Sequence, residues 1–197
     1  MSLCTAAAAL FAFNRTPLPQ LLVAALVGVV LFFVTEYTTH RFLFHMAPPK
    51  NPFLRRLIYR LHYHHHEEPN DLHLLFLPLW YSLPQFVIMG TIAWWITGEI
   101  GLAAGFLTGS MGLLIFYEWM HYVAHRPITP LTPWGRWMKK YHLWHHFKNE
   151  HYWYGVTNPS FDLLLGTYRD VASVEKSPTA RKLDARAGLA ANGEQEG

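Results

Sequence analysis

The chain has 197 residues, of which 51% are hydrophobic and 15% are charged, and its formal net charge is +3. Soluble domains carry about 25% charged residues, so this composition favours a single domain in contact with lipid over a soluble protein. The basic residues flank apolar segments and no nucleic-acid-binding motif is found, which excludes nucleic acid as the reason for the positive charge. The single cysteine, Cys4, excludes an internal disulfide.

The N-terminal part of the chain divides into a short segment and a first span. In the segment 1–16, the apolar stretch 3–13 is too short to cross a bilayer alone, since about 20 residues are needed, and we expect it to lie in the membrane interface. The first span is predicted over 17–44 and has no charged residue from 21 to 34. It lacks a basic leader and runs directly into histidines, so we interpret it as a permanent membrane helix and not as a cleaved signal peptide.

Two further spans follow as a helical hairpin. Only Gly98 and Glu99 lie between the apolar segments 72–97 and 100–122. With the first span, they predict an all-α integral membrane protein with three to four transmembrane helices. The tail 173–197 is rich in small, charged and polar residues, and we expect it to be disordered.

The number of crossings predicts where the remaining segments lie. Three spans place 40–71 and 121–197 on the same side of the membrane. All thirteen histidines fall at or close to this side, as does every Lys and Arg except Arg15. By the positive-inside rule this face is cytoplasmic. We therefore expect a cytosolic helical cap that holds a histidine-rich site.

Ten of the thirteen histidines form four clusters at ligand spacing. Residues three and four apart share one face of a helix, so each triplet points to one side. Imidazole is the commonest protein metal ligand, and ten imidazoles exceed what one ion can use. The clusters are His40 and His45; His62, His65 and His66; His121 and His125; and His142, His145 and His146.

The clusters also repeat along the chain. The last four members of the first half recur with identical spacing in the second half, and His40 recurs, one position out of step, as His121. This repeat predicts quasi-symmetric use of two halves around two metal ions, while accidental equal spacing remains an alternative. His40 and His45 are five positions apart, or about 140° around an α-helix. One of them, more readily His45 before two prolines, is expected at or past the helix end.

Two acidic residues precede histidines within the spans. Glu36 lies four residues before His40, and Glu118 lies three residues before His121. Carboxylates inside a membrane are costly, and we expect these two to orient ligand imidazoles. The second pair also matches one Glu-x-x-His unit of ferritin-like di-metal bundles, but such sites need two units and two more acids. Three histidines outside the repeat are expected to support the ligands or to lie at the surface: His64, His73 and His151.

Two amphipathic segments lead directly into the histidine triplets. Residues 52–61 place leucine, isoleucine and phenylalanine on one side and three arginines roughly opposite, and 133–141 has a similar pattern of tryptophan and lysine. Such helices lie in the headgroup plane, where they would set the metal site just below the lipid surface and admit an acyl chain. The alternative is an anchor without a role in substrate binding.

These motifs resemble the histidine boxes of the fatty acid hydroxylase superfamily (the sterol desaturase family), and are closest to those of fatty acid 2-hydroxylases. The resemblance covers about residues 30–170. The order of the four boxes is specific for the superfamily but much less so for the substrate. The matching segments are 36–49; 62–66 with Pro69, Asp71 and Leu77-Pro78; and 141–149 with 155–157 and 162–167.

The resemblance implies a membrane catalytic domain over 17–172 that holds two metal ions, generally iron. Such enzymes insert oxygen from O2 into an unactivated C–H bond of a lipid, here foremost a fatty acyl chain. The implied metal ligands are the ten clustered histidines, with Asp162 as a supporting residue in the last motif. Zinc stays open as the metal, because imidazole suits both ions.

The chain also departs from the family pattern. Fatty acid 2-hydroxylases often carry a cytochrome b5 domain, which is not found here, so electrons are expected from a separate donor such as cytochrome b5, a ferredoxin or a reductase. The family commonly has four spans, whereas three are predicted here. Which residues form the wall of the substrate tunnel is therefore not predicted, and an oligomer that completes the wall is an open alternative.

Other functions stay open at this point. A desaturase, or a sterol or carotenoid oxidase, shares the same boxes. A zinc-dependent membrane hydrolase would use about three histidines, an acid and an open position for water, and ten histidines overfill such a site. A metal transporter would distribute its ligands along a path across the bilayer, whereas these histidines gather at one face.

Overall fold

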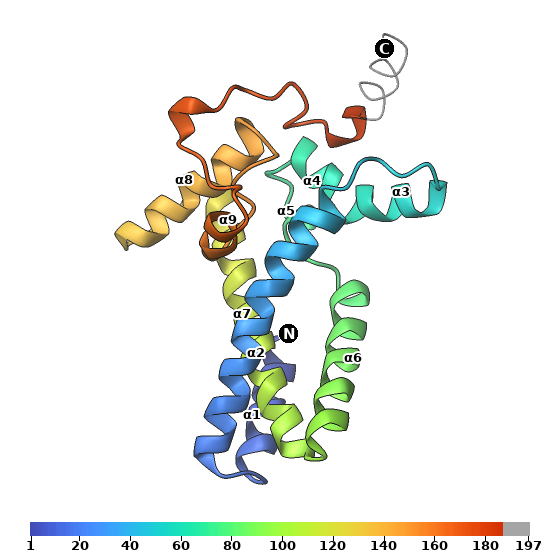
Figure 1. Cartoon of the computed structure of the whole chain (residues 1–197), viewed down its shortest axis with the longest axis vertical. Coiled ribbons are helices and arrows are strands. Elements are labelled where there is room, and N and C mark those ends of the chain that lie inside the picture. The colour runs from blue at the N-terminus through green and yellow to red at the C-terminus, as the bar shows by residue number, and fades with distance from the viewer. Residues whose placement is uncertain (187–197) are drawn as a thin grey trace. The chain divides into compact units, whose positions relative to one another are not determined.

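The computed structural model describes residues 1–186, and within them the chain is helical and has no strand (Figure 1). It divides into two compact units. The transmembrane unit comprises Met1–Thr35 and Leu77–Glu118, and the histidine unit comprises Glu36–Phe76 and Trp119–Gly197. All ten clustered histidines belong to the histidine unit.

Three helices are long and apolar enough to cross a membrane: Leu18–Phe44, Leu72–Thr97 and Ile100–His125. They confirm the three predicted spans. The hairpin turns at Gly98, whose φ of +67° is favourable only for glycine. The helices that contribute to the transmembrane unit are α1 (Ser2–Phe13), α2 (Leu18–Thr38), α6 (Leu79–Thr97) and α7 (Ile100–His125).

Glycines let α2 and α7 approach each other closely. A Cβ atom added at Gly109 would lie 2.0 Å from the carbonyl oxygen of Ala25, and one at Gly28 would lie 2.2 Å from that of Phe106. Ser110 Oγ donates a hydrogen bond to the carbonyl oxygen of Gly28 at 3.1 Å. In lipid, helices associate through such close packing and hydrogen bonds, because burial of apolar surface adds no driving force.

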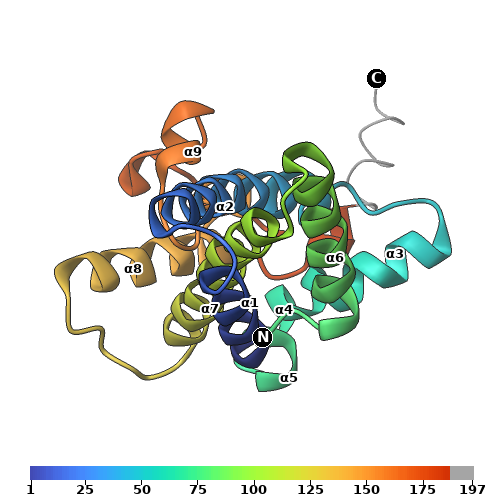
Figure 2. The same cartoon turned by 90° about the horizontal axis from the view of Figure 1, so that it is seen from below.

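The N-terminal helix α1 packs against the spans. Its Ala12 is buried together with Leu21 of α2 and Ala104 of α7, and Figures 1 and 2 show α1 beside these two helices. A small residue such as Ala12 lets α1 fit against the neighbouring helices, and the interfacial position that the sequence predicted for this segment stays a prediction. Its 12 residues are too few to cross the bilayer.

The histidine unit contains two π-helical turns at its first two histidine clusters. In the turn η1 (Thr39–Phe44), the amide of His45 donates to the carbonyl oxygen of His40 at 3.1 Å. Because this i→i+5 bond closes one π-turn, it brings together two residues that an α-helix would separate. His45 caps the turn, as its spacing predicted. The second turn, η2 (Tyr59–Tyr63), leads directly into α4 (His64–Glu67).

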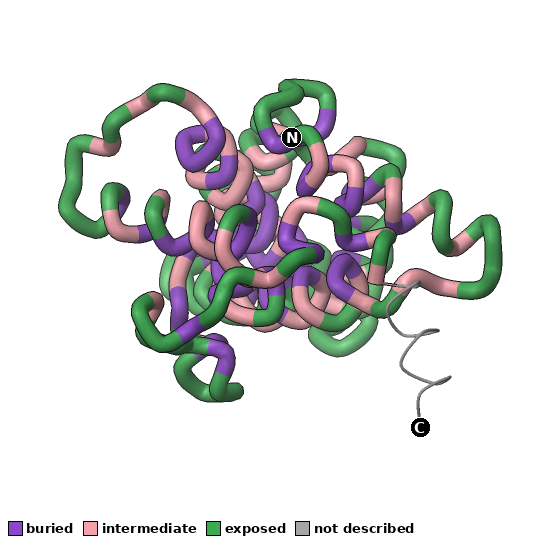
Figure 3. Tube along the Cα trace, turned by 90° about the horizontal axis from the view of Figure 1, so that it is seen from above, coloured by how far each residue is buried: buried purple, intermediate pink, exposed green. Residues whose placement is uncertain are grey.

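Short capped helices complete the histidine unit. The Asn51 side chain accepts hydrogen bonds from Phe53 N and Leu54 N and caps the N-terminus of α3 (Pro52–Ile58). Thr132 Oγ1 accepts a hydrogen bond from Gly135 N and caps the N-terminus of α8 (Pro133–Phe147). Figure 3 shows buried residues recurring between exposed ones along the chain. The remaining elements are α5 (Leu72–Leu75), α9 (Ser160–Leu164) and the 3-10 turns η3 (Val171–Ser173) and η4 (Leu183–Ala185).

The first part of the C-terminal tail is ordered, contrary to the expectation of disorder from residue 173. Leu183 is fully buried against Ile58 and Tyr63. Arg181 and Arg186 donate hydrogen bonds to main-chain carbonyls of the histidine unit. A few side chains hold this segment in place, and it has no long apolar face that its sequence pattern would have shown. The rest of the predicted disordered tail, 187–197, lies outside the described residues.

The close helix crossing leads to a first prediction. Gly109→Ala should destabilise the protein by about 1–3 kcal/mol, because the added methyl group meets the α2 backbone. The measurement is thermal unfolding of the purified protein in detergent. Gly112→Ala is the matched control, since a Cβ atom there meets nothing within 4 Å. Equal melting temperatures for the two variants would contradict the proposed tight crossing.

Candidate metal centre

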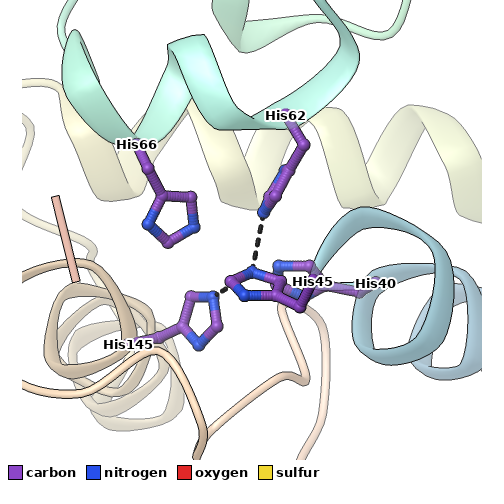
Figure 4. Close-up of side chains that lie close together, drawn as sticks. All are labelled: His40, His45, His62, His66 and His145. Carbon is purple, nitrogen blue, oxygen red and sulfur yellow. Dashed lines mark hydrogen bonds between the residues drawn. The ribbon is translucent and has the colours of Figure 1, made fainter. Parts of the chain in front are cut away.

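The ten clustered histidines come together as two groups of five. Within each group, one ligand nitrogen from each residue lies within 4.8 Å of all the others. All ten side chains are 6% exposed or less. Figure 4 shows the rings of the first group converging from three separate parts of the chain. The first histidine group is His40, His45, His62, His66 and His145, and the second histidine group is His65, His121, His125, His142 and His146.

The grouping interleaves the two triplets. In the first triplet, His62 and His66 belong to the first group and His65 belongs to the second. In the second triplet, His142 and His146 belong to the second group and His145 belongs to the first. The rings of His66 and His146 stack at a centroid distance of 4.0 Å, so the groups adjoin. Each member of one group has its repeat counterpart in the other, which is the quasi-symmetric arrangement that the spacing predicted. The counterparts are His40 and His121, His45 and His125, His62 and His142, His66 and His146, and His145 and His65.

Distances between ring nitrogens fit a shared metal ion. The Nε2 atoms of His45 and His62 lie 2.8 Å apart, and those of His45 and His145 lie 2.9 Å apart. In the second group, the Nε2 atoms of His65 and His121 are 2.9 Å apart. Two nitrogens bound at right angles to one ion, each about 2.1 Å from it, would be about 3.0 Å apart.

Unpartnered nitrogens point to the same conclusion. Among the described residues, Nε2 of His40, His66 and His146 is buried and has no hydrogen-bond partner. A buried polar atom without a partner costs about 1–3 kcal/mol. A metal ion would satisfy these lone pairs, so the donor set fits two ions, each among five imidazoles.

Main-chain carbonyls hold several of the rings from behind. Each accepts a hydrogen bond from Nδ1–H, which fixes the tautomer and puts the lone pair of the ring on Nε2. The pairs are His40 with Tyr154 at 2.5 Å, and His66 with Ala180, His145 with Tyr152 and His121 with Leu75, each at 2.8 Å.

Burial also keeps the imidazoles in the form that binds metal. It lowers the pKa of His145 to about 3 and moves the pKa values of His62, His66, His142 and His146 well below their usual value. For these last four histidines, neighbouring imidazoles add to the shift because they disfavour a second positive charge. The rings are therefore neutral at pH 7, as metal ligands must be.

Asp162 organises the loop that supplies two of the carbonyl acceptors. This buried carboxylate accepts hydrogen bonds from Tyr154 N at 2.9 Å, Gly155 N at 2.7 Å and Thr167 Oγ1 at 2.7 Å. Between the two acceptor residues lies Trp153, whose φ of +61° is unusual for a residue with a side chain. Its side chain is fully buried. The loop is thus fixed by packing at Trp153 and by hydrogen bonds to the Asp162 carboxylate at Tyr154 and Gly155.

Glu36 contacts this loop and not an imidazole. Its Oε1 accepts from Val156 N at 2.8 Å and Thr157 N at 2.9 Å, and its Oε2 accepts from Thr157 Oγ1 at 2.5 Å. The expected direct contact with a ligand is therefore replaced by support of the loop that holds His40.

The other supporting candidates belong to neither histidine group. His64 is half-buried and stacks on Tyr59. His73 is exposed, and His151 is exposed beside the carboxylate of Glu150. Glu118 lies in the transmembrane unit, where it hydrogen-bonds the Leu77 backbone.

Sequence reasoning missed the main-chain acceptors of the four rings, together with Trp153 and Arg181. The acceptors carry no residue-type signal, because any residue offers a carbonyl. Arg181, which donates to the carbonyl oxygen of His66, lies in the part of the chain that composition marked as a tail.

The chain is similar to known fatty acid hydroxylases. A family model described as fatty acid hydroxylase matches residues 25–167. The chain is 32% identical to dihydroceramide fatty acyl 2-hydroxylase FAH2 of Arabidopsis thaliana, over 80% of this chain and 65% of that one. It is 30% identical to ceramide very long chain fatty acid hydroxylase scs7 of Schizosaccharomyces pombe, over 83% of this chain and 47% of that one.

A solved structure has the same fold. Full-length scs7p, in which only the hydroxylase domain is visible, matches with a TM-score of 0.77 at 26% identity, over 89% of this chain and 66% of that one. The chain thus spans less than two thirds of each of these relatives. The family match contains all ten grouped histidines and ends before the C-terminal residues that contact them.

Metal content tests the division into two groups. His66→Ala should lower the metal content of the purified protein from two ions per chain towards one, because it removes one of five imidazoles from the first group. His64→Ala is the control, since this neighbouring histidine lies outside both groups. Metal analysis after dialysis against a mild chelator provides the measurement. A His66→Ala protein that keeps two ions as firmly as the control would contradict the ligand set.

The lowered pKa of His145 predicts a pH dependence of stability. Between its usual value of 6.5 and about 3, the unfolded chain binds more protons here than the folded chain. The free energy of unfolding of the metal-free protein should therefore decrease as the pH is lowered from 6.5 towards 3, by about 1.4 kcal/mol per pH unit from this one group. Denaturant unfolding at several pH values should show a shallower slope for His145→Gln than for His64→Gln. Equal slopes would mean that His145 is protonated in the folded chain.

Proposed function

This chain belongs to the fatty acid hydroxylase family, and we propose that it is a membrane oxidoreductase that hydroxylates an unactivated C–H bond of a lipid acyl chain with O2. The observation that carries the proposal is the pair of adjoining five-imidazole groups, both buried. The balanced reaction consumes O2, two electrons and two protons, places one oxygen atom in the product and releases the other as water.

We propose iron as the metal, since the reaction needs ions that change oxidation state and zinc does not. When bound, the two ions supply O2 activation and removal of hydrogen from the substrate carbon. The chain itself holds the ions through ten neutral imidazoles, orients those rings through main-chain carbonyls, and keeps water from the site by burial. Exclusion of water protects a strong oxidant from side reactions.

The substrate proposal follows from the relatives. Their names specify dihydroceramide fatty acyl 2-hydroxylation and ceramide very long chain fatty acid hydroxylation. We propose that this chain likewise acts at carbon 2 of an amide-linked fatty acyl chain. We propose further that the site faces the cytoplasm, where a separate electron-donor protein has access, since nearly all Lys and Arg residues fall on that side of the predicted spans.

The composition of the two groups argues against a zinc hydrolase. Both groups consist of histidine alone, with no cysteine, aspartate or glutamate among their members. A hydrolytic zinc site uses three ligands and an open position for water. A desaturase of the same family would use the same ligands, so the product decides between the two reactions.

Lipid analysis tests the proposed reaction. Cells that express the wild-type chain should accumulate acyl lipids heavier by one oxygen atom, and His142→Ala should abolish this gain because it removes a ligand of the second group. Mass spectrometry of extracted sphingolipids makes the measurement, with His64→Ala as the matched active control. A loss of two hydrogen atoms in place of the gain would indicate desaturation. Identical lipids with wild type and His142→Ala would refute the site.

A further inference from the structure

The last described residues lie across the first histidine group. We name residues 177–186 the C-terminal strap. They lie beyond residue 167, where the family match ends. Figure 1 shows this part of the chain passing from the region of α8 towards α4 and α3, all within the histidine unit. Its contacts are therefore a feature of this chain that the family match does not describe.

The strap contacts the ligand His66 on both its ring and its backbone. The carbonyl oxygen of Ala180 accepts a hydrogen bond from Nδ1–H of His66 at 2.8 Å. The neighbouring Arg181 donates from Nε to the carbonyl oxygen of His66 at 2.6 Å, and from a guanidinium nitrogen to that of Glu67. One turn of α4 is thus held between two consecutive strap residues.

Anchors on both sides fix the position of Ala180. On one side, Thr179 Oγ1 donates to the fully buried carboxylate of Glu150. On the other side, Leu183 is fully buried and the carboxylate of Asp184 accepts two hydrogen bonds from Arg55. The carbonyl acceptor therefore has little freedom to move away from the ring.

The strap reaches a second ligand of the same group. Arg186 donates to the carbonyl oxygens of His45 at 3.1 Å and Met46 at 3.0 Å. The hydrogen bonds from the strap thus reach His45 and His66, both in the first group. These contacts place the support given by the strap at the first group.

We propose that the strap is a positioning element of the metal centre, with Arg181 as its principal positioning residue. The inference rests on the proposed two-metal function. Three other rings receive their carbonyl acceptor from residues within the family match, whereas His66 receives its acceptor from the strap. Its Nε2 is buried and unpartnered among the described residues, so the strap holds this lone pair towards the ion. Loss of such an outer partner lowers metal affinity about 10- to 100-fold.

Metal release from the purified full-length chain tests the proposal. The protein is loaded with Co²⁺, and release to a chelator is followed together with the visible spectrum of the bound ion. Wild type should release both ions slowly. Arg181→Ala should release one of its two ions about 10- to 100-fold faster, with a spectral change confined to that ion. Arg181→Lys, which keeps the charge but not the forked donor, should be intermediate.

The matched control is Lys182→Ala, at the exposed neighbouring position, which should behave as wild type. Release from Arg181→Ala as slow as from this control would overturn the strap's role and leave the proposed function standing. Wild-type protein that binds fewer than two ions would instead overturn the proposed function. If Arg181→Ala fails to fold, Thr179→Val removes the hydrogen bond to Glu150 that anchors the strap on the other side of Ala180, and it should give the same two-phase release. Equal acceleration of both ions would overturn the selective role.

Discussion

The histidine unit depends on one constraint: imidazole nitrogens buried at its centre need partners. One nitrogen of each ring faces the other members of its group, where neutral lone pairs converge and only a metal ion can satisfy them together. In four of the rings, the opposite nitrogen donates to an acceptor in the surrounding shell. Main-chain carbonyls serve His40, His66, His121 and His145 in this way. The loops and the strap are the parts of the chain that bring those carbonyls to the rings.

The spacing of the histidines predicted much of this arrangement. Residues three and four apart share a helix face, so each histidine triplet could be expected to point to one side. The three spans could be expected from the length of the apolar segments. The recurrence of the same spacing in the second half also indicated that the two halves use their ligands alike. It did not show that neighbours such as His65 and His66 serve different groups. This follows because adjacent residues on a helix point about 100° apart and can face two ions side by side.

The rest could not be predicted, because it depends on the backbone and on sparse anchors. A π-turn, which joins His45 to His40, has no compositional signal. The carbonyls behind the rings are equally invisible in sequence. The strap reads as a polar tail, because few apolar residues such as Leu183 hold it and its arginines act through main-chain acceptors. Glu36 was correctly singled out as a costly buried acid, but its partners lie 120 residues away.

The position of the carboxylates explains how this site differs from carboxylate-bridged di-metal bundles. In those bundles glutamates bind the ions and offset their charge. Here Glu36 and Asp162 accept backbone amides, and they act one loop behind the rings. They stabilise the geometry without donating negative charge to the metals. Two ions held among neutral imidazoles would keep their full positive charge in a dry surround, which would favour binding of anionic oxygen species and require a rigid protein shell. The strap extends that shell over the first group.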